Sequence, residues 1–258
     1  MESLLTGRRV LITRPRAQSE ILATILRTKG VSPIISPAME LLPLEPDMSE
    51  VGCEFDLIVF VSPNSVDYGW KAIRPIIEVD RPPIVATVGL ATARKLKGKA
   101  RNILVPEGEG GGKPLIRLLR KYSSERIRST LIVRGQGGDD YLETSLRDLG
   151  CSVDVLECYQ RVDLTQPQES SVRDEVKAGI DAWVVTSRQS LLNIWMQFRD
   201  EQEVLKRTPL FVNHSAVASI ALERDVKDVF VCGNASEKIR EGLEAWFSKN
   251  TDEVKGVN

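Results

Sequence analysis

An internal repeat with an offset of 120 residues is the feature that most constrains how this chain folds. When segment 10–32 is laid over segment 130–152, nine of 23 positions are identical. The identical pairs are Leu11/Leu131, Ile12/Ile132, Arg14/Arg134, Leu22/Leu142, Thr24/Thr144, Leu26/Leu146, Arg27/Arg147, Gly30/Gly150 and Ser32/Ser152. Offsets of 125 and 126 then align 56–70 with 181–195 and 83–108 with 209–234, in the same order. The repeat predicts two similar domains; convergent patterning of unrelated strand–helix units is the alternative.

Within each half, short apolar runs alternate with amphipathic stretches. Residues 9–13 predict a buried strand, after which Leu22, Ile25 and Leu26 recur at helical spacing before Gly30 offers a stop. Further strands are predicted near residues 31–36, 56–61, 83–88, 102–105, 130–134, 152–162, 182–186, 209–213 and 228–231. Such alternation is typical of α/β proteins with parallel, helix-covered sheets.

Length and composition narrow the class of protein further. The 258 residues suffice for two domains of ordinary size, and the net charge of -1 gives no basic field for nucleic acid. No apolar run approaches the roughly 20 residues of a membrane span, so a cytoplasmic protein without membrane or nucleic-acid partners, and a monomer, is expected. The cysteines Cys53, Cys151, Cys158 and Cys232 are expected to be reduced thiols, and a single histidine, His214, argues against a metal site.

Polar residues follow many of the predicted strands. Ligands of open α/β sheets bind beyond the carboxyl ends of the strands, and two lobes without a long spacer suggest a cleft between them. The candidate substrate-binding residues at these strand ends are Arg14, Ser62, Asn64, Thr92, Arg134, Gly135, Thr186, Ser187 and Ser215. Each hydroxyl or amide could instead be a helix N-cap, and each arginine could be solvated. Together with helix N-termini they favour a ligand with several anionic groups, so Arg14 and Arg134 are expected to face the cleft and bind carboxylates.

The common nucleotide-binding motifs are not matched. Gly135-Gln136-Gly137-Gly138 begins like a dinucleotide fingerprint, but Leu142 follows where no glycine helps. The glycine-rich stretch 108–113 ends in lysine, yet Pro114 stands where a phosphate-binding loop needs Ser or Thr; a turn before a helix at 114–122 is favoured instead. No G-x-S-x-G elbow is present. No metal, nucleotide, flavin or other cofactor is therefore expected.

These segments, taken in order, resemble the uroporphyrinogen-III synthase family over about residues 8–248. Each motif is weak alone because the family is divergent, but the ordered set is fairly specific. The matching stretches are Val10–Pro15 with Gln18, Phe55–Val66, Val88–Ala93, Leu131–Gly135, Tyr159-Gln160-Arg161 and Asp181–Ser187.

The resemblance refines the domain boundaries. It implies two similar parallel-sheet, flavodoxin-like α/β domains joined by a two-stranded antiparallel linker, whereas the repeat alone would divide the chain at about residue 125. The implied boundaries are 1–36 with 165–258 for domain 1, 45–157 for domain 2, and about 37–44 and 158–164 for the linkers. The proline spacing suits extended chain in the first linker: Pro33, Pro37, Pro43 and Pro46.

The resemblance also implies a reaction. A uroporphyrinogen-III synthase, a lyase, cyclises hydroxymethylbilane, a linear tetrapyrrole, with loss of water and inversion of ring D, giving uroporphyrinogen III for haem and sirohaem biosynthesis. Tyr159 matches the family phenol and is the candidate proton donor to the leaving hydroxyl, with a hinge-packing tyrosine as the alternative. Ser62, Thr92 and Ser187 match family positions, while His214-Ser215 departs from the family turn. A non-catalytic bilobal binding module for an anionic metabolite, or a two-domain glycosyltransferase, stay open as other functions.

Overall fold

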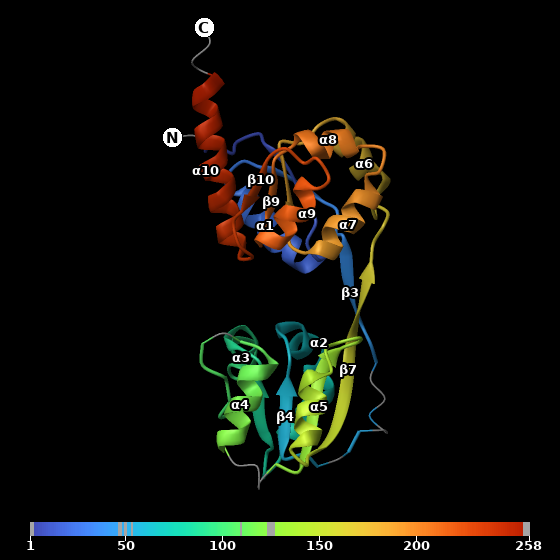
Figure 1. The fold of residues 1–258 in the computed structure, drawn as a ribbon, viewed down its shortest axis with the longest axis vertical. Coiled ribbons are helices and arrows are strands. Elements are labelled where there is room, and N and C mark those ends of the chain that lie inside the picture. The colour runs from blue at the N-terminus through green and yellow to red at the C-terminus, as the bar shows by residue number, and fades with distance from the viewer. Residues whose placement is uncertain are drawn as a thin grey trace. The chain divides into compact units, whose positions relative to one another are not determined.

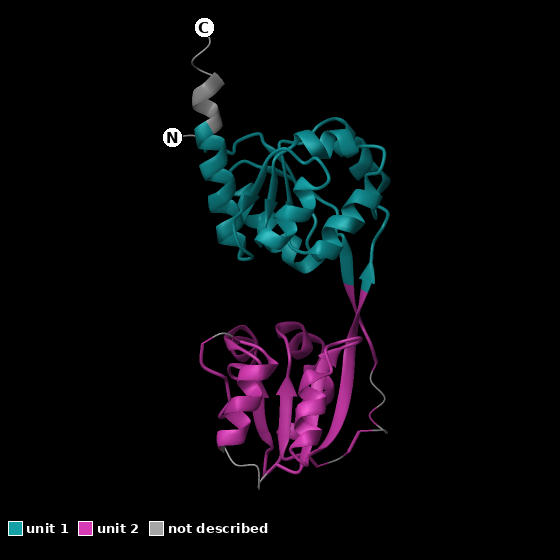
Figure 2. Cartoon of the chain, viewed as in Figure 1, with its two compact units in different colours: residues 1–40, 162–258 teal, residues 41–161 magenta. Residues whose placement is uncertain are grey.

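The computed structural model describes residues 3–45, 48, 51–52, 54–108, 110–122 and 127–254. The chain forms two compact units, shown in Figure 2. Unit 1 comprises residues 1–40 and 162–258, and unit 2 comprises residues 41–161. Each unit holds one five-stranded sheet. The units therefore do not divide near residue 125, although the repeat on its own suggests that cut.

Unit 1 is built on a sheet with the strand order β10-β9-β8-β1-β2, and all four strand pairs are parallel (Figure 1). Leu11 in β1 lies opposite Ile34 on one side and Trp183 on the other. The strands are β1 (Arg9–Ile12), β2 (Ser32–Ile35), β8 (Ala182–Val185), β9 (Leu210–Val212) and β10 (Val229–Val231). They are nearly continuous apolar runs because both faces of a parallel sheet are covered.

Helices cover both faces of the unit 1 sheet. One face carries α1 (Arg16–Arg27) and α10 (Ser236–Val254), whose residues Leu22, Leu26, Ile239 and Leu243 share one apolar core. The other face carries α6 (Ser170–Lys177), α7 (Arg188–Gln197), α8 (Gln202–Arg207) and α9 (Ser215–Leu222). Gly30, with a left-handed φ of 78°, ends the turn that follows α1.

Unit 2 repeats this plan with the strand order β3-β7-β6-β4-β5. The strands are β3 (Met39–Pro43), β4 (Leu57–Phe60), β5 (Ile84–Thr87), β6 (Ser129–Gly135) and β7 (Ser152–Asp163). The pairs formed by β4, β5, β6 and β7 are parallel. All four residues of β4 are buried, as expected for an interior strand of a sheet that is covered on both faces.

The helices of unit 2 also lie on both faces of their sheet. They are α2 (Pro63–Ile77) and α3 (Leu90–Leu96) on one face, and α4 (Gly112–Tyr122) and α5 (Tyr141–Asp148) on the other. The extended strands β3 and β7 carry the chain between the units. The Leu44 N–H donates to the Cys158 carbonyl and the Leu164 N–H to the Ala38 carbonyl, so these two segments run antiparallel.

The α/β fold expected from the sequence is confirmed, with one difference in detail. The predicted strand at 102–105 is reduced to a single bridge between Ala86 and Leu104, because Asn102 adopts a left-handed φ of 50° and Pro106 ends the extended stretch. Pro46 and Cys53 lie outside the described residues. In the described part of the chain, no helix has the length and apolar character needed to cross a bilayer.

Candidate functional site

The candidate site is a pocket of about 450 Å³ in unit 2, at the carboxyl ends of the strands. Its wall includes Ser62 after β4, Val88 after β5, Gly135 at the end of β6, and Tyr159 with Arg161 on β7. A larger hollow of about 690 Å³ lies at the amino end of β5 instead. Because ligands of α/β sheets bind beyond the carboxyl ends of the strands, the smaller pocket is the stronger candidate.

Tyr159 is the central side chain of this pocket. It is only 2% exposed, and its ring lies 5.4 Å from the ring of Tyr68. Its hydroxyl lies 3.3 Å from the Ser62 Oγ, and either oxygen could be the donor. The carbonyl of Tyr159 accepts a 2.7 Å hydrogen bond from the Gln136 N–H. Hydrogen-bond contacts thus hold both the main chain and the side chain of Tyr159 at the wall of the pocket.

Gly135 makes the position of the Tyr159 ring possible. A Cβ at residue 135 would lie 2.4 Å from the Tyr159 Cζ and 2.8 Å from its hydroxyl oxygen, which is closer than non-bonded atoms approach. The pairing of β6 with β7 shifts register between Arg134 and Gly135, so that Gly135 lies opposite Tyr159. The glycine is required here for the close approach of a side chain, since its φ is not left-handed.

Ser62 is both a pocket residue and the N-cap of α2. Its Oγ accepts a 3.0 Å hydrogen bond from the Ser65 N–H, and the Ser65 Oγ accepts one of 3.1 Å from the Ser62 N–H. This reciprocal capping fixes the Ser62 hydroxyl beside Tyr159. Asn64 and Thr92 lie in the first turns of α2 and α3, half-buried and buried respectively, and neither lines the pocket.

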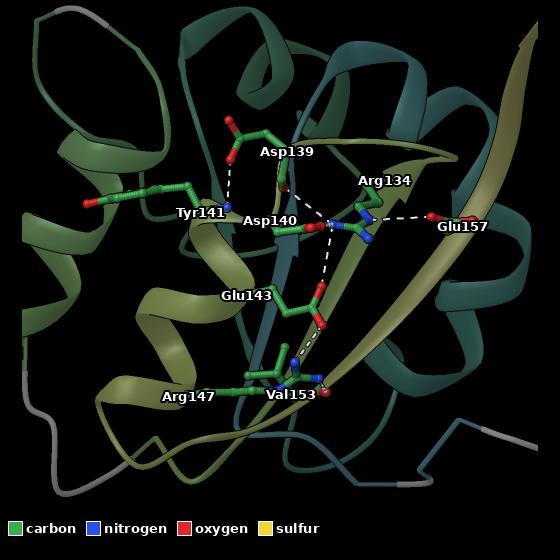
Figure 3. A network of polar contacts seen from close by, with 8 residues as sticks. All are labelled: Arg134, Asp139, Asp140, Tyr141, Glu143, Arg147, Val153 and Glu157. Atoms are coloured by element: carbon green, nitrogen blue, oxygen red, sulfur yellow. Dashed lines mark hydrogen bonds and ion pairs between the residues drawn. The ribbon is translucent and has the colours of Figure 1, made fainter.

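Arg134 lines the pocket but is held by carboxylates of its own unit, as Figure 3 shows. Its Nη1 lies 3.1 Å from Asp140 and 3.4 Å from Glu143, and its Nε lies 3.6 Å from Glu157. These four residues form what we call the Arg134 network. The Arg134 side chain is 13% exposed, and its ion pairs link the end of β6 to α5 and β7. The positive charge predicted for ligand binding is therefore largely neutralised within the chain.

Of the predicted strand-end hydroxyls of unit 1, Ser187 serves as a helix cap. The Ser187 Oγ accepts from the Ser190 N–H at 3.0 Å and donates to the Ser190 Oγ at 2.7 Å, and Thr186 before it is half-buried. Ser215 is the exposed first residue of α9, which is capped by the Nδ1 of His214. Capping accounts for Ser187 locally, since the cap satisfies N–H groups that a helix leaves unpaired.

Arg14 has different surroundings from Arg134. The residue is 6% exposed; its Nη1 donates to the Ser236 Oγ and its Nη2 to the Asn234 carbonyl, both at 3.1 Å. Its buried Nε has no hydrogen-bond partner in the described structure. Burial lowers the pKa of the Arg14 guanidinium, and the nearby Cys232 opposes this shift. A guanidinium stays charged even so, which leaves a buried cation at the end of β1.

Two basic residues of the pocket were not among the predicted site residues. Arg161 stands two positions after Tyr159 on β7, so both side chains lie on the same side of the strand, with the guanidinium carbon 5.9 Å from the ring centroid. That period-of-two spacing could have identified Arg161. Lys113 lies in the first turn of α4, and its Nζ lies 5.9 Å from the Tyr141 ring centroid. The glycine-rich stretch ahead of Lys113 predicted only a turn.

The fold and pocket define a class: a two-unit parallel α/β protein with a pocket at the strand ends of one unit that is lined in part by hydroxyl and basic side chains. The family model described as uroporphyrinogen-III synthase HemD matches residues 20–238. The chain belongs to the uroporphyrinogen-III synthase family, as the sequence motifs predicted, which makes it an enzyme of tetrapyrrole synthesis.

Known proteins agree with this assignment along most of the chain. The uroporphyrinogen-III synthase of Escherichia coli K12 is 28% identical over 242 residues, which cover 88% of this chain and 95% of that protein. The putative uroporphyrinogen-III synthase of Methanocaldococcus jannaschii is 26% identical over 208 residues, or 77% and 82% of the two chains.

Solved structures share the fold. A mutant uroporphyrinogen III synthase from the extremely thermophilic bacterium Thermus thermophilus superposes with a TM-score of 0.57 at 17% identity, covering 94% of this chain and all of that one. A uroporphyrinogen-III synthetase from Helicobacter pylori gives a TM-score of 0.54 at 15% identity, covering 93% and 99% of the two chains.

Proposed function

We propose that this chain is a lyase that converts hydroxymethylbilane into uroporphyrinogen III. The observation that carries the proposal is the meeting of two hydroxyls, on Tyr159 and Ser62, 3.3 Å apart at the wall of the unit 2 pocket. Family membership supplies the reaction class, and the pocket supplies a proton donor with basic neighbours, Arg161 and Lys113, for a polycarboxylate.

The atom that most needs a proton donor in this reaction is the oxygen of the terminal hydroxymethyl group. The C–O bond of the terminal hydroxymethyl group breaks, and the Tyr159 hydroxyl transfers its proton to the leaving oxygen, so that water departs. The azafulvenium cation that remains is attacked by the substituted carbon of ring D, and the spiro intermediate fragments and recloses with that ring turned over. A proton lost as the pyrrole regains aromaticity restores the phenol. The Ser62 hydroxyl, fixed by its capping bonds, stabilises the phenolate by donating to it.

The direct test is the product formed from synthetic hydroxymethylbilane. The proposal predicts uroporphyrinogen III, measured by chromatographic separation of the oxidised isomers. A non-catalytic binding module would bind the bilane and leave only the isomer I that forms unaided. A glycosyltransferase would instead be stabilised by nucleotide sugars in a thermal-shift screen, without turning over the bilane.

We expect this activity to need no metal, nucleotide or flavin. Among the described residues, no group of three or more His, Cys, Asp or Glu side chains is placed to hold a metal ion, and the sequence has one histidine. Protein treated with a chelator and then desalted should retain turnover within about twofold of the untreated sample, which corresponds to a change of about 0.4 kcal/mol in the barrier. Loss of activity that one metal alone restores would contradict the expectation.

The Arg134→Gln substitution should reduce stability more than it changes substrate binding. The substitution leaves the three carboxylates of the Arg134 network without their shared cation. This loss is expected to lower the free energy of unfolding by about 1–3 kcal/mol. The measurement is urea unfolding, with Arg147→Gln as control because that arginine pairs with Glu143 from a 56% exposed position. A several-fold rise in KM at unchanged stability would show instead that Arg134 binds the ligand.

Location and assembly are part of the same proposal. We propose a cytoplasmic monomer acting on a small tetrapyrrole, with neither nucleic acid nor membrane as partner. Cell fractionation tests the location, and size-exclusion chromatography with light scattering tests the monomer.

A further inference from the structure

A corner of unit 1 combines a buried cation with two helix N-termini. The helices α1 and α10 lie side by side on one face of the sheet, each following a parallel strand, so both begin at its carboxyl edge (Figure 1). The guanidinium of Arg14 reaches from the end of β1 to Asn234 and Ser236, at the start of α10. Helix N-termini carry partial positive charge, so this corner gathers positive charge from three sources.

The described residues supply no anion to balance that charge. No carboxylate among them lies within ion-pair distance of Arg14, and its Nε has no hydrogen-bond partner. The helix α1 opens without a side-chain cap and without an acidic residue in its first turn. Glu237 is the acidic residue in the first turn of α10, but it is exposed. Charged side chains are almost never buried unless an opposite charge pairs with them, and the two hydrogen-bond partners of Arg14 are neutral, so a counter-anion is the missing element.

The internal repeat allows the charge environment of Arg14 to be compared with that of the equivalent arginine in unit 2. Arg14 and Arg134 are equivalent at the offset of 120 residues, and the Arg134 network supplies three carboxylates. The same offset places Glu20, Ala23 and Pro37 at the positions of those carboxylates. Of these only Glu20 is acidic, and it lies 3.7 Å from Arg27 instead. One copy of the repeat thus neutralises the charge of its arginine with carboxylates, and in the other copy the described residues supply no carboxylate to the arginine.

We propose that Arg14, Ser236 and the first turns of α1 and α10 form a subsite for one carboxylate group. The guanidinium N–H groups, the Ser236 hydroxyl and the foremost N–H groups of the two helices are donors suited to such an anion. The Gln18 and Ser19 N–H groups are not among them, because both donate to the Pro15 carbonyl. This inference rests on the proposed function in one respect: the carboxylate is then a substituent of the tetrapyrrole.

The subsite is tested first by titration of the intact protein with sodium propionate, followed by backbone amide NMR. Saturable shifts are expected at residues 16–19 and 236–239, and not with sodium chloride at the same ionic strength. Sodium sulfate serves as the other oxyanion. Shifts with sulfate but not propionate, or no saturable shift in the wild-type protein, would overturn a carboxylate subsite. This arm needs no substituted protein and no turnover.

Substitution then locates the response. Arg14→Gln should abolish the propionate shifts, and Arg14→Lys, which keeps the charge but not the planar fork, should retain part of them. The matched control is Arg27→Gln, which removes an exposed charge from the other end of α1 and should respond as wild type does. Propionate shifts that persist unchanged in folded Arg14→Gln would exclude Arg14.

Kinetics separate this inference from the proposed function. Arg14→Gln should raise the KM for hydroxymethylbilane about tenfold, the effect of one lost charge-assisted contact, with kcat within about threefold. If the wild-type protein makes uroporphyrinogen III and Arg14→Gln does so with unchanged KM, the subsite fails while the function stands. If the wild-type protein makes none, the propionate titration still decides whether the subsite exists.

Discussion

Replacing Tyr159 by phenylalanine should lower kcat about 100-fold and change KM by no more than about twofold. A general acid contributes about 10²–10⁴-fold, and the lower end applies because the bilane is reactive and water can partly substitute as donor. The ring should keep its place, since its contacts with Tyr68 and Gly135 do not involve the hydroxyl hydrogen. Steady-state turnover, with folding checked by circular dichroism, measures the effect.

Three comparisons make this result specific. Tyr68→Phe removes a hydroxyl from the neighbouring ring, which donates to the Leu41 carbonyl, and should cost far less turnover. Ser62→Ala should lower kcat by a smaller factor and also destabilise α2 by about 1 kcal/mol through loss of its cap. Thr92 and Ser187 substitutions should have smaller effects on turnover than Tyr159→Phe. Wild-type turnover in Tyr159→Phe, with loss on changing Thr92 or Ser187, would move the leaving-group assistance to the strand-end hydroxyls.

The fold could be predicted because its signals are local and repeated. A strand buried on both faces must be apolar throughout, as Leu57–Phe60 and Ala182–Val185 are. Helix caps such as Ser62 and Ser187 mark where the next element begins. The segment 102–105 has three apolar residues, but Asn102 adopts a left-handed conformation and limits the pairing to a single bridge. Asparagine is a residue type that favours this conformation, so the sequence held a signal that the apolar pattern did not use.

The candidate site was harder to predict because its geometry depends on contacts between distant segments. Ser62 and Tyr159 are 97 residues apart, and their meeting depends on the order of β4, β6 and β7 in the sheet and on one register shift. Arg14 and Arg134 are the same residue at equivalent repeat positions, yet one meets carboxylates and the other meets none among the described residues. A strand-end rule identifies such residues as candidates, but only the packing of neighbouring elements distinguishes their roles.

Adding one methyl group at residue 135 should disrupt the site as severely as removing the phenol. In Gly135→Ala the new Cβ would lie 2.4 Å from the Tyr159 Cζ, so the ring or the end of β6 must move. Overpacking of this kind costs about 1–3 kcal/mol, and here the displaced atoms carry the proposed proton donor. We expect unfolding free energy to fall by about 2 kcal/mol and kcat by about 100-fold or more.

The control for this substitution is Gly89→Ala, because Gly89 also has an extended backbone but a Cβ there would meet nothing closer than 3.5 Å. Because Gly89 is the N-cap of α3, where alanine is less favoured, the substitution should cost up to about 1 kcal/mol and leave kcat within about twofold of wild type. The cause is tested by repeating Gly135→Ala in a Tyr159→Leu background, where the ring is gone. If the clash with the ring is responsible, the stability cost of the alanine should be at least halved there, a coupling of about 1 kcal/mol. Equal costs in both backgrounds would mean that Gly135 is needed for the turn of the main chain and not for the approach of Tyr159.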